Sequence, residues 1–455
     1  MSNINAKLNI AFIHPDLGIG GAERLVVDAA AGIQSKGHQV VMYTSHHDPN
    51  HCFEETRNGT LSVRVFGDFL PREIFGKFYI ICAMLRQFAL ILWILWNDRD
   101  TYDVFFVDQL SMCVPLLKWF TSSKVLFYCH FPDKMLSVRN STLKELYRVP
   151  IDLLEEWTTS KADTITVNSQ FTATIFRKSF RSILKKPRVL YPPINFALYD
   201  RQVDMSDITV QILESDRKTC LSINRFERKK NVELALRAFA ALSQLVPASE
   251  FDNYRLVLAG GYDRRVTENV EYLKELDKLA RQTFGLETFI IYPSCTEKPP
   301  RTAQVVFLCS FNDAQRTYLL NSSVMLLYTP SNEHFGIVPV EAMYASLPVI
   351  AANSGGPLET VIDQKTGLIL PPEPELWAKG MSDILLSKYD RQEMGRAGHD
   401  HVKDKFSLEA FTDQLEDILE ELASGGRPSK HKYDNVEYII RIIIAIAIFI
   451  VWYKY

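Results

Sequence analysis

The chain has 455 residues, too many for one ordinary hydrophobic core, so the sequence predicts two domains. Hydrophobic residues make up 47% and charged residues 23% of it, as in an ordinary folded protein, and the net charge of -3 argues against a nucleic-acid-binding protein. Seven cysteines lie singly, so no close pair suggests a zinc site, and we expect reduced thiols on the cytosolic side. Residues 1–7 are polar and predict no secretory signal.

The amino-terminal stretch predicts a βαβ unit. Apolar strands are expected over residues 8–14 and 39–44, with a helix over 24–36 between them. The loop before the helix contains Gly20 and Gly21, which allow the backbone to approach a bound phosphate or sugar closely. A dinucleotide-dependent dehydrogenase would also use such a loop, although the G-x-G-x-x-G spacing is absent.

His130 stands at a favoured position for a ligand contact. Further strands are expected over residues 103–107, 124–129, 164–168 and 189–194, and His130 directly follows the second of them. The carboxyl ends of strands are where open α/β sheets place their ligands. A lone histidine is more often structural, but this position favours a functional role.

Residues 79–96 are almost entirely apolar and carry Trp93 and Trp96 near their end. The stretch approaches the length of a membrane span. A single crossing would separate the strand at 103–107 from the first strand by a bilayer, so we expect a helix that lies in the membrane surface. A fully buried domain helix is the alternative.

The second half repeats the alternation after a polar linker at residues 195–215. Strands are expected over 219–224, 255–259, 305–308, 324–328 and 348–352, and helices over 232–245, 268–283 and 406–422. The predicted fold is therefore α/β, with two doubly wound Rossmann-like domains at 1–200 and 201–423 that face each other across a cleft.

A second hydrophobic stretch lies near residue 455, the last residue of the sequence. Residues 424–435 form a polar, basic linker, and the isoleucine-rich segment 436–453 follows. The basic residues favour a cytosolic position for its amino-terminal end. The segment falls short of a clean span, so it is compatible with a crossing, a tilted insertion or a surface position.

The stretch 331–341 organises the second domain. It follows an apolar strand, and Gly336 and Pro339 predict a tight turn into the first turn of a helix. The N–H groups of residues 336–338 would then form an anion site, with Glu333 before it and Glu341 about one turn inside the helix. A strand–turn–helix with two solvated glutamates is the alternative on this spacing alone.

Arg225 and Lys230 flank a loop after the first strand of the second domain and suggest a second anion site. A charge run of this kind is usually a solvated face, but beside the turn at Gly336 it predicts a diphosphate clamp. A lone Asp-x-Asp at residues 98–100 is interpreted as a polar loop, so no metal site is predicted.

Together these stretches resemble a known family. Glu333 and Glu341 match the E-x7-E motif of the retaining GT-B glycosyltransferases of family 4, and the resemblance is strongest to the dolichol-pathway mannosyltransferases that make α-1,3 and α-1,6 linkages. The motifs that carry it lie at residues 12–24, 127–133, 167–172, 259–263 and 331–341.

The resemblance implies that GDP-mannose binds the second domain, with Arg225 and Lys230 holding the diphosphate. Residues 334–338 (His334, Phe335, Gly336, Ile337 and Val338) would assist, and Glu341 would accept from the ribose hydroxyls. Glu333 would contact the mannose near its anomeric carbon.

His130 and the loop with Gly20 and Gly21 would complete the sugar site from the acceptor-binding first domain. The catalytic set implied is therefore Glu333, His130, Lys230 and Arg225. GDP-mannose is a substrate, and neither a cofactor nor a metal is expected.

The family also implies an acceptor and a location. The acceptor would be Man1GlcNAc2-PP-dolichol, and two additions would give Man3GlcNAc2-PP-dolichol for N-linked glycosylation. Both hydrophobic stretches would then hold the catalytic domains at membrane lipid on the cytosolic face of the endoplasmic reticulum. Other early mannosyltransferases of the pathway are candidate partners. A non-catalytic sugar-nucleotide-binding partner of a membrane complex is the alternative function.

Overall fold

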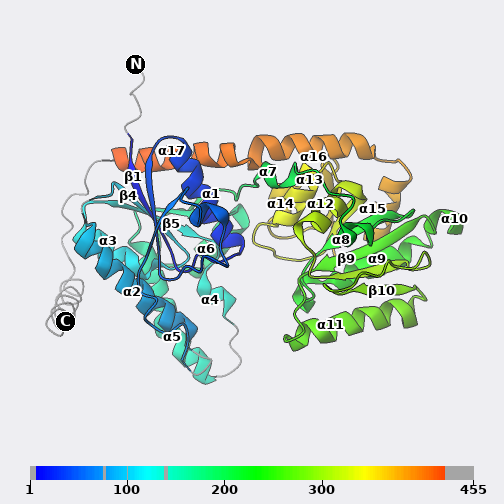
Figure 1. Cartoon of the computed structure of the whole chain (residues 1–455), viewed down its shortest axis with the longest axis horizontal. Coiled ribbons are helices and arrows are strands. Elements are labelled where there is room, and N and C mark those ends of the chain that lie inside the picture. Colours follow the sequence, from blue (N-terminus) through cyan, green and yellow to red (C-terminus); the bar gives the residue numbers. More distant parts are fainter. Residues whose placement is uncertain (1–6, 75–77, 100, 138–141, 426–455) are drawn as a thin grey trace, which may run out of the picture. The chain divides into compact units, whose positions relative to one another are not determined.

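The computed structural model describes residues 7–74, 78–99, 101–137 and 142–425, which form two compact units (Figure 1). The first unit comprises the described residues up to Val167, then Ala173–Leu190 and the chain from Thr412. The second comprises Asn168–Thr172 and Tyr191–Phe411. The predicted hydrophobic segment 436–453 lies outside the described residues, as does all but the start of the predicted linker 424–435.

The first unit contains a parallel seven-stranded sheet with the order β3-β2-β1-β4-β5-β6-β7. Its strands are β1 (Asn9–His14), β2 (Gln39–Thr44), β3 (Ser62–Val65), β4 (Val104–Asp108), β5 (Lys124–Cys129), β6 (Thr164–Val167) and β7 (Arg188–Val189). Its main helices are α1 (Gly21–Ser35), α2 (Tyr79–Asn97), α3 (Val114–Phe120) and α5 (Thr142–Ser160), and α6 (Gln170–Ser179) and α17 (Leu408–Ser424) belong to it in part. The inner strands are apolar and buried on both faces, as a covered parallel sheet requires.

The second unit repeats this plan with the order β10-β11-β9-β8-β12-β13-β14. Its strands are β8 (Lys218–Ile223), β9 (Tyr254–Gly260), β10 (Thr288–Ile291), β11 (Val305–Cys309), β12 (Ser323–Tyr328), β13 (Val349–Ala352) and β14 (Gly367–Leu370). Its main helices are α9 (Val232–Leu242), α11 (Thr267–Lys278), α12 (Asp313–Ser322), α13 (Ile337–Tyr344), α15 (Pro374–Leu385) and α16 (Arg391–Phe406). Figure 1 labels both sheets and their helices, and the predicted pair of doubly wound α/β domains is confirmed.

Two hydrophobic layers cover the sheet of the second unit. One layer contains side chains of α9, α11 and α15, with Trp377 fully buried, and the other contains side chains of α12, α13 and α16. Because helices lie on both faces, the ligand-binding positions left by the fold are the loops at the strand ends.

Helix α2 packs one face on the first unit and exposes the other. Leu90, Ile91 and Ile94 are buried in the core cluster, whereas Leu85 is 51% and Trp96 is 73% exposed. Within the described part of the chain, α2 is the one helix long and apolar enough to cross a membrane by length and composition. The helix is therefore not fully buried, and its predicted position in the membrane surface stays a prediction.

The polar residues of α2 are satisfied inside the unit. The buried Arg86 donates to the carbonyl of Leu70 at 2.9 Å and pairs with Asp68. The buried Gln87 donates to the carbonyl of Leu110 at 2.8 Å. These contacts are the reason that an arginine and a glutamine interrupt an otherwise apolar helix.

Candidate active site

The stretch predicted to organise the second domain forms the connection from β12 to α13. Gly336 is the N-cap residue of α13 with φ +82°, and Asn332 also has a positive φ of +56°. No side chain caps the helix, so its first N–H groups face the connection. The predicted strand–turn–helix is therefore present, with a glycine where the backbone is left-handed.

The neighbouring turn after β13 holds this connection in place. The N–H of Gly356 donates to the carbonyl of Glu333 at 2.8 Å, and the N–H of Asn332 donates to the hydroxyl of Ser354 at 3.1 Å. A Cβ at Gly356 would lie 2.1 Å from the carbonyl oxygen of Phe335. The sequence held no sign that the glycine turn after β13 supports Glu333.

Lys230 and Glu333 meet although 103 residues separate them in the chain. Lys230 Nζ lies 2.5 Å from Glu333 Oε2, and the two side chains are 17% and 21% exposed. The hydroxyl of Thr329 donates to the carbonyl of Lys230 at 2.7 Å, which ties the two loops together. Burial raises the pKa of Glu333, but hydrogen bonding and charge attraction from Lys230 outweigh it, so that the pKa lies below its usual value.

Arg225 follows β8 but is not part of that ion pair. Its side chain is 67% exposed, and Nη1 lies 3.4 Å from Glu227 Oε1. A Cβ at Gly261 would lie 3.2 Å from Arg225 Cγ, so the glycine turn after β9 gives the arginine its room. The structure thus presents Arg225 to solvent on the same edge of the sheet that carries Lys230.

Glu341 is buried rather than presented to solvent. It is 3% exposed, its Oε1 accepts from Tyr199 at 2.8 Å and pairs with Arg316, and its Oε2 is covered and has no partner among the described residues. A ligand hydroxyl could reach this carboxylate only if Arg316 moved aside. Sequence reasoning missed Arg316 and Tyr199, because neither lies in the motif.

The remaining residues of the predicted donor stretch have mixed environments. Phe335 is 5% exposed and packs against Tyr191 and Phe406, so its side chain belongs to the core. The carbonyl of His334 accepts from Ser169 at 2.5 Å. The side chain of Phe335 is therefore not available to a ligand, while Ile337 is 36% exposed.

In the first unit, His130 belongs to a cluster of titratable side chains that the sequence did not reveal. Asp108 Oδ1 lies 2.9 Å from His130 Nε2, and Asp108 Oδ2 lies 2.8 Å from His14 Nδ1. Glu23 Oε1 lies 3.7 Å from the other ring nitrogen of His14. The signal that could have found them is the position of His14 and Asp108 at the carboxyl ends of their strands.

Ion pairing overcomes burial in this cluster. Burial lowers the pKa of His14, but Asp108 and then Glu23 raise it to about 9. Burial raises the pKa of Asp108, but attraction to the neighbouring His130 and His14 rings outweighs burial and lowers it to about 2. At neutral pH His14 is therefore an imidazolium and Asp108 a carboxylate.

The predicted glycine loop lies at the amino terminus of α1. Gly20 is the N-cap residue with extended backbone, and a Cβ there would meet the end of the Glu23 side chain at 2.2 Å. Gly21 is exposed, with no heavy atom within 4 Å of a Cβ. The loop thus leaves backbone accessible at the start of a 15-residue helix.

The loop after His130 is anchored by α5. Glu155 accepts from the N–H groups of Asp133 at 2.7 Å and Lys134 at 3.1 Å. Burial, with a smaller contribution from the charges of Asp133 and Asp152, raises the pKa of Glu155 to about 7.

We therefore expect the free energy of unfolding to fall as pH rises from about 4.5 to about 7, because the folded state holds a proton on Glu155 that the unfolded state has lost. The difference amounts to at most about 3 kcal/mol. Melting temperatures of wild type and Glu155→Gln at pH 5, 6, 7 and 8 measure this dependence of stability on pH. Glu155→Gln should lose the dependence. The control Glu145→Gln, on the exposed first turn of α5, should keep it. Parallel curves for all three proteins would contradict the expectation.

One group of described residues has the composition of a metal site, namely His38, Glu416 and Glu420. His38 Nδ1 accepts from the N–H of Leu8 at 3.1 Å, so Nε2 carries the proton and donates to Glu416 at 3.0 Å. A metal at Nε2 would push that proton onto Nδ1, against the N–H of Leu8. We interpret the group as the contact that holds α17 on the first unit, not as a metal centre.

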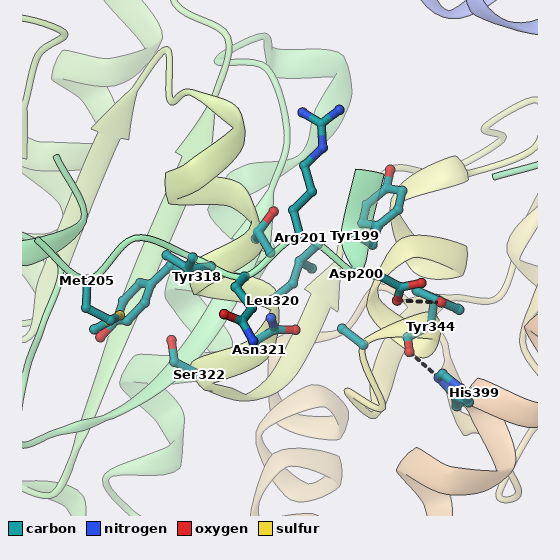
Figure 2. Close-up of a pocket in the computed structure, with 14 residues that line it drawn as sticks. Tyr199, Asp200, Arg201, Met205, Tyr318, Leu320, Asn321, Ser322, Tyr344 and His399 are labelled. Atoms are coloured by element: carbon teal, nitrogen blue, oxygen red, sulfur yellow. Dashed lines mark hydrogen bonds between the residues drawn. The ribbon is translucent and has the colours of Figure 1, made fainter. Parts of the chain in front are cut away.

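Figure 2 shows a pocket of about 530 Å³ in the second unit. Tyr344 donates to Asp200 at 2.7 Å and offers its carbonyl to His399. The pocket is lined by the carboxyl-terminal ends of α12 and α13, whereas Glu333 lies before the amino terminus of α13. This pocket is therefore distinct from the Lys230–Glu333 site.

Comparisons with known proteins identify the class of this chain. Residues 19–198 match the family model "Glycosyltransferase Family 4", and residues 206–401 match "Glycosyl transferases group 1". Among solved structures, the chain is similar to sucrose-phosphate synthase from Thermosynechococcus elongatus, with a TM-score of 0.68, 20% identity, and coverage of 92% of this chain and 100% of that one. It is also similar to WaaG, a glycosyltransferase involved in lipopolysaccharide biosynthesis, with a TM-score of 0.60, 18% identity and the same coverage. The class is thus a two-domain glycosyltransferase of the GT-B fold.

Curated relatives narrow the class. The alpha-1,3/1,6-mannosyltransferase ALG2 of Rhizomucor pusillus is 66% identical over 419 residues, which is 91% of this chain and 92% of that protein. The protein of the same name from Mus musculus is 45% identical over 90% of this chain and 94% of its own length. The chain belongs to this family of alpha-1,3/1,6-mannosyltransferases and is a glycosyltransferase. The resemblance expected from the motifs is confirmed.

Proposed function

We propose that the chain transfers two mannoses, one α-1,3 and one α-1,6, from GDP-mannose to Man1GlcNAc2-PP-dolichol. The product is Man3GlcNAc2-PP-dolichol, an intermediate of N-glycan precursor assembly. The observation that carries the proposal is the contact of 2.5 Å between Lys230 and Glu333 beside the amino terminus of α13. It places a cation, a carboxylate and the uncapped N–H groups of a helix start together, as a diphosphate-bearing sugar donor requires.

Lys230 supplies the charge that stabilises the departing diphosphate. Glu333 pairs with it in the structure, so an incoming diphosphate competes with that carboxylate for the ammonium group. When Lys230 turns to the phosphate, Glu333 is released to accept from hydroxyls of the mannose. The exposed Arg225 provides a second cation on the same edge of the sheet.

The donor phosphate serves as the base in this proposal. The anomeric bond to the diphosphate breaks while the acceptor hydroxyl attacks from the same face of the sugar, and the departing phosphate oxygen takes the hydroxyl proton. Retention of configuration follows without an enzymic nucleophile. Neither a metal nor a cofactor takes part.

The acceptor accounts for the exposed apolar face of α2. A diphosphate-headed lipid stays in its bilayer, so the enzyme has to work at the membrane surface. Exposed Leu85 and Trp96 suit that position, and the tryptophan matches the interfacial preference of its ring. We place the catalytic units on the cytosolic face of the endoplasmic reticulum, with other early mannosyltransferases as candidate partners.

Product analysis tests the proposal. Purified full-length chain is incubated with GDP-mannose and a short-chain Man1GlcNAc2 lipid diphosphate, and the products are analysed by mass and by linkage-specific mannosidases. Two added hexoses, one in each linkage, are expected with or without EDTA. Donor binding without any product would favour the non-catalytic partner. Activity that is lost in EDTA and restored by Mn²⁺ would contradict the metal-free scheme.

Glu341→Ala is expected to weaken donor binding more than it disturbs the fold. The variant removes the carboxylate that pairs with Arg316 and, in this proposal, receives the ribose hydroxyls once Arg316 moves. We expect Kd for GDP to rise about 10-fold, measured by calorimetry, which corresponds to about one lost hydrogen bond to a charged group. Arg316→Ala is the companion variant. It should bind GDP as well as wild type or better if Arg316 only covers Glu341, and unchanged binding by Glu341→Ala would remove the ribose role.

A further inference from the structure

Three neighbouring strands of the first unit lead to a row of three titratable side chains, His14, Asp108 and His130, at the carboxyl edge of the sheet. We call this row the ladder. The rings of Phe12, Phe106 and Tyr128 stack across β1, β4 and β5, with centroids 4.7 Å and 6.0 Å apart. His14, Asp108 and His130 lie two residues after each of these rings. Because side chains alternate along a strand, the three aromatic rings and the three titratable side chains lie on the same face of the sheet.

Asp108 is the centre of this ladder and is completely buried. A buried carboxylate costs several kcal/mol unless it is paired. His14 satisfies Oδ2 at 2.8 Å, and Oδ1 receives both the N–H of Gln109 at 2.9 Å and the approach of His130. Gln109 adopts a φ of +62° directly after the strand, a strained value for this residue type of the kind found at functional sites.

His130 is the one member of the ladder that solvent reaches, with its side chain 23% exposed. Its ring is fixed from two sides, by Asp108 at 2.9 Å from Nε2 and by the edge-to-face ring of Tyr128 at 4.9 Å. The N–H of His130 is not aimed straight at the oxygen, so the contact is a close polar approach rather than an aligned hydrogen bond. A carboxylate at that distance nevertheless requires the hydrogen on Nε2, which leaves Nδ1 for a ligand.

We propose that Asp108 is a positioning residue that fixes the ring orientation and tautomer of His130, with His14 as the counter-charge that keeps Asp108 in place. His130 then presents Nδ1 as a hydrogen-bond acceptor to a sugar hydroxyl. The inference rests on the proposed role of His130 in mannosyl transfer. Asp108 and His14 do not touch the sugar themselves, so their effect on turnover passes through His130.

A double-mutant cycle in the mannosyl-transfer assay tests it, with wild type, D108N, H130A and D108N/H130A as full-length chains. D108N should lower kcat by roughly 10- to 100-fold, the range for partners that orient a functional histidine, while KM for GDP-mannose changes less than about 2-fold. In the H130A background, D108N should lower kcat by less than about 2-fold. D103N, at the other end of β4, is the matched control and should behave as wild type.

Multiplied losses in D108N/H130A would show that Asp108 acts on the fold and would overturn the inference. H130A with normal turnover would overturn it as well and would remove His130 from the site. A wild-type chain without any mannose transfer would instead sink the proposed function, and this inference with it.

D108N leaves the buried imidazolium of His14 without its carboxylate, which threatens folding. If D108N melts more than about 5 °C below wild type, H14N/D108N replaces D108N in the cycle, and H14N/D108N/H130A replaces D108N/H130A. Each chain in the cycle then holds both the His14 and the Asp108 charge or neither, and the same two outcomes decide.

Discussion

Lys230→Ala is expected to reduce kcat/KM for mannosyl transfer by at least about 100-fold while the chain stays folded. The substitution removes the cation that stabilises charge on the departing diphosphate, and electrostatic groups of this kind contribute about 3–4 kcal/mol to the transition state. Steady-state kinetics with GDP-mannose and the lipid acceptor measure the loss, and a melting curve checks the fold.

Lys229→Ala is the matched control. It alters the neighbouring lysine in the same loop, which is 70% exposed and pairs with Glu227 at 3.0 Å instead of Glu333. This variant should keep wild-type kinetics. Glu333→Ala should lose turnover to a similar extent as Lys230→Ala. Near-normal activity of both Lys230→Ala and Glu333→Ala would show that the site lies elsewhere.

Gly356→Ala should damage activity and stability together. Its Cβ would lie 2.1 Å from the carbonyl oxygen and 2.4 Å from the Cα of Phe335, and these are backbone atoms that no rotamer change can relieve. The connection that carries Glu333 then has to shift, and the hydrogen bond from the N–H of Gly356 to Glu333 is lost. We expect a loss of about 2–3 kcal/mol, which lowers the melting temperature by about 4–12 °C, and a fall in kcat of at least about 10-fold.

Gly425→Ala provides the comparison for Gly356→Ala. A Cβ there meets its nearest atoms at 3.5 Å and 3.6 Å, and the backbone is not left-handed. Its melting temperature and kcat should match those of wild type. Wild-type activity in Gly356→Ala would mean that the turn after β13 does not support the site.

The order of the inner strands could be read from the sequence because these strands are continuous apolar runs. Three strands escaped the prediction, namely β3, β10 and β14, and all three lie at sheet edges. Each has only four residues, and β3 is largely exposed, so their hydrophobic signal is weak.

The candidate site also contains residues that could be predicted from the sequence and residues that could not. Lys230, Glu333 and the left-handed Gly336 could be named from the sequence because motif and turn chemistry mark them. The salt bridge between Lys230 and Glu333 could not, since it depends on how two distant loops fold. Arg316 and Tyr199 have no local signature, because each acts through Glu341, which lies more than 20 residues away in the chain. The burial of Glu341 could not be predicted because its partners Tyr199 and Arg316 are distant in the sequence.

The division of the chain between its two units has a practical consequence. Residues 168–172 belong to the second unit although the chain on both sides of them belongs to the first. The described residues from Thr412 to Gly425 belong to the first unit again, where Gly32 leaves room for Thr412 and Lys36 pairs with Asp413. A fragment that stops at residue 200 therefore lacks a piece of its own fold, and one that spans 201–423 carries a piece of the other. Neither fragment is therefore suitable for expression or ligand screening. An enzyme split into two chains would need cut sites other than residues 200 and 423.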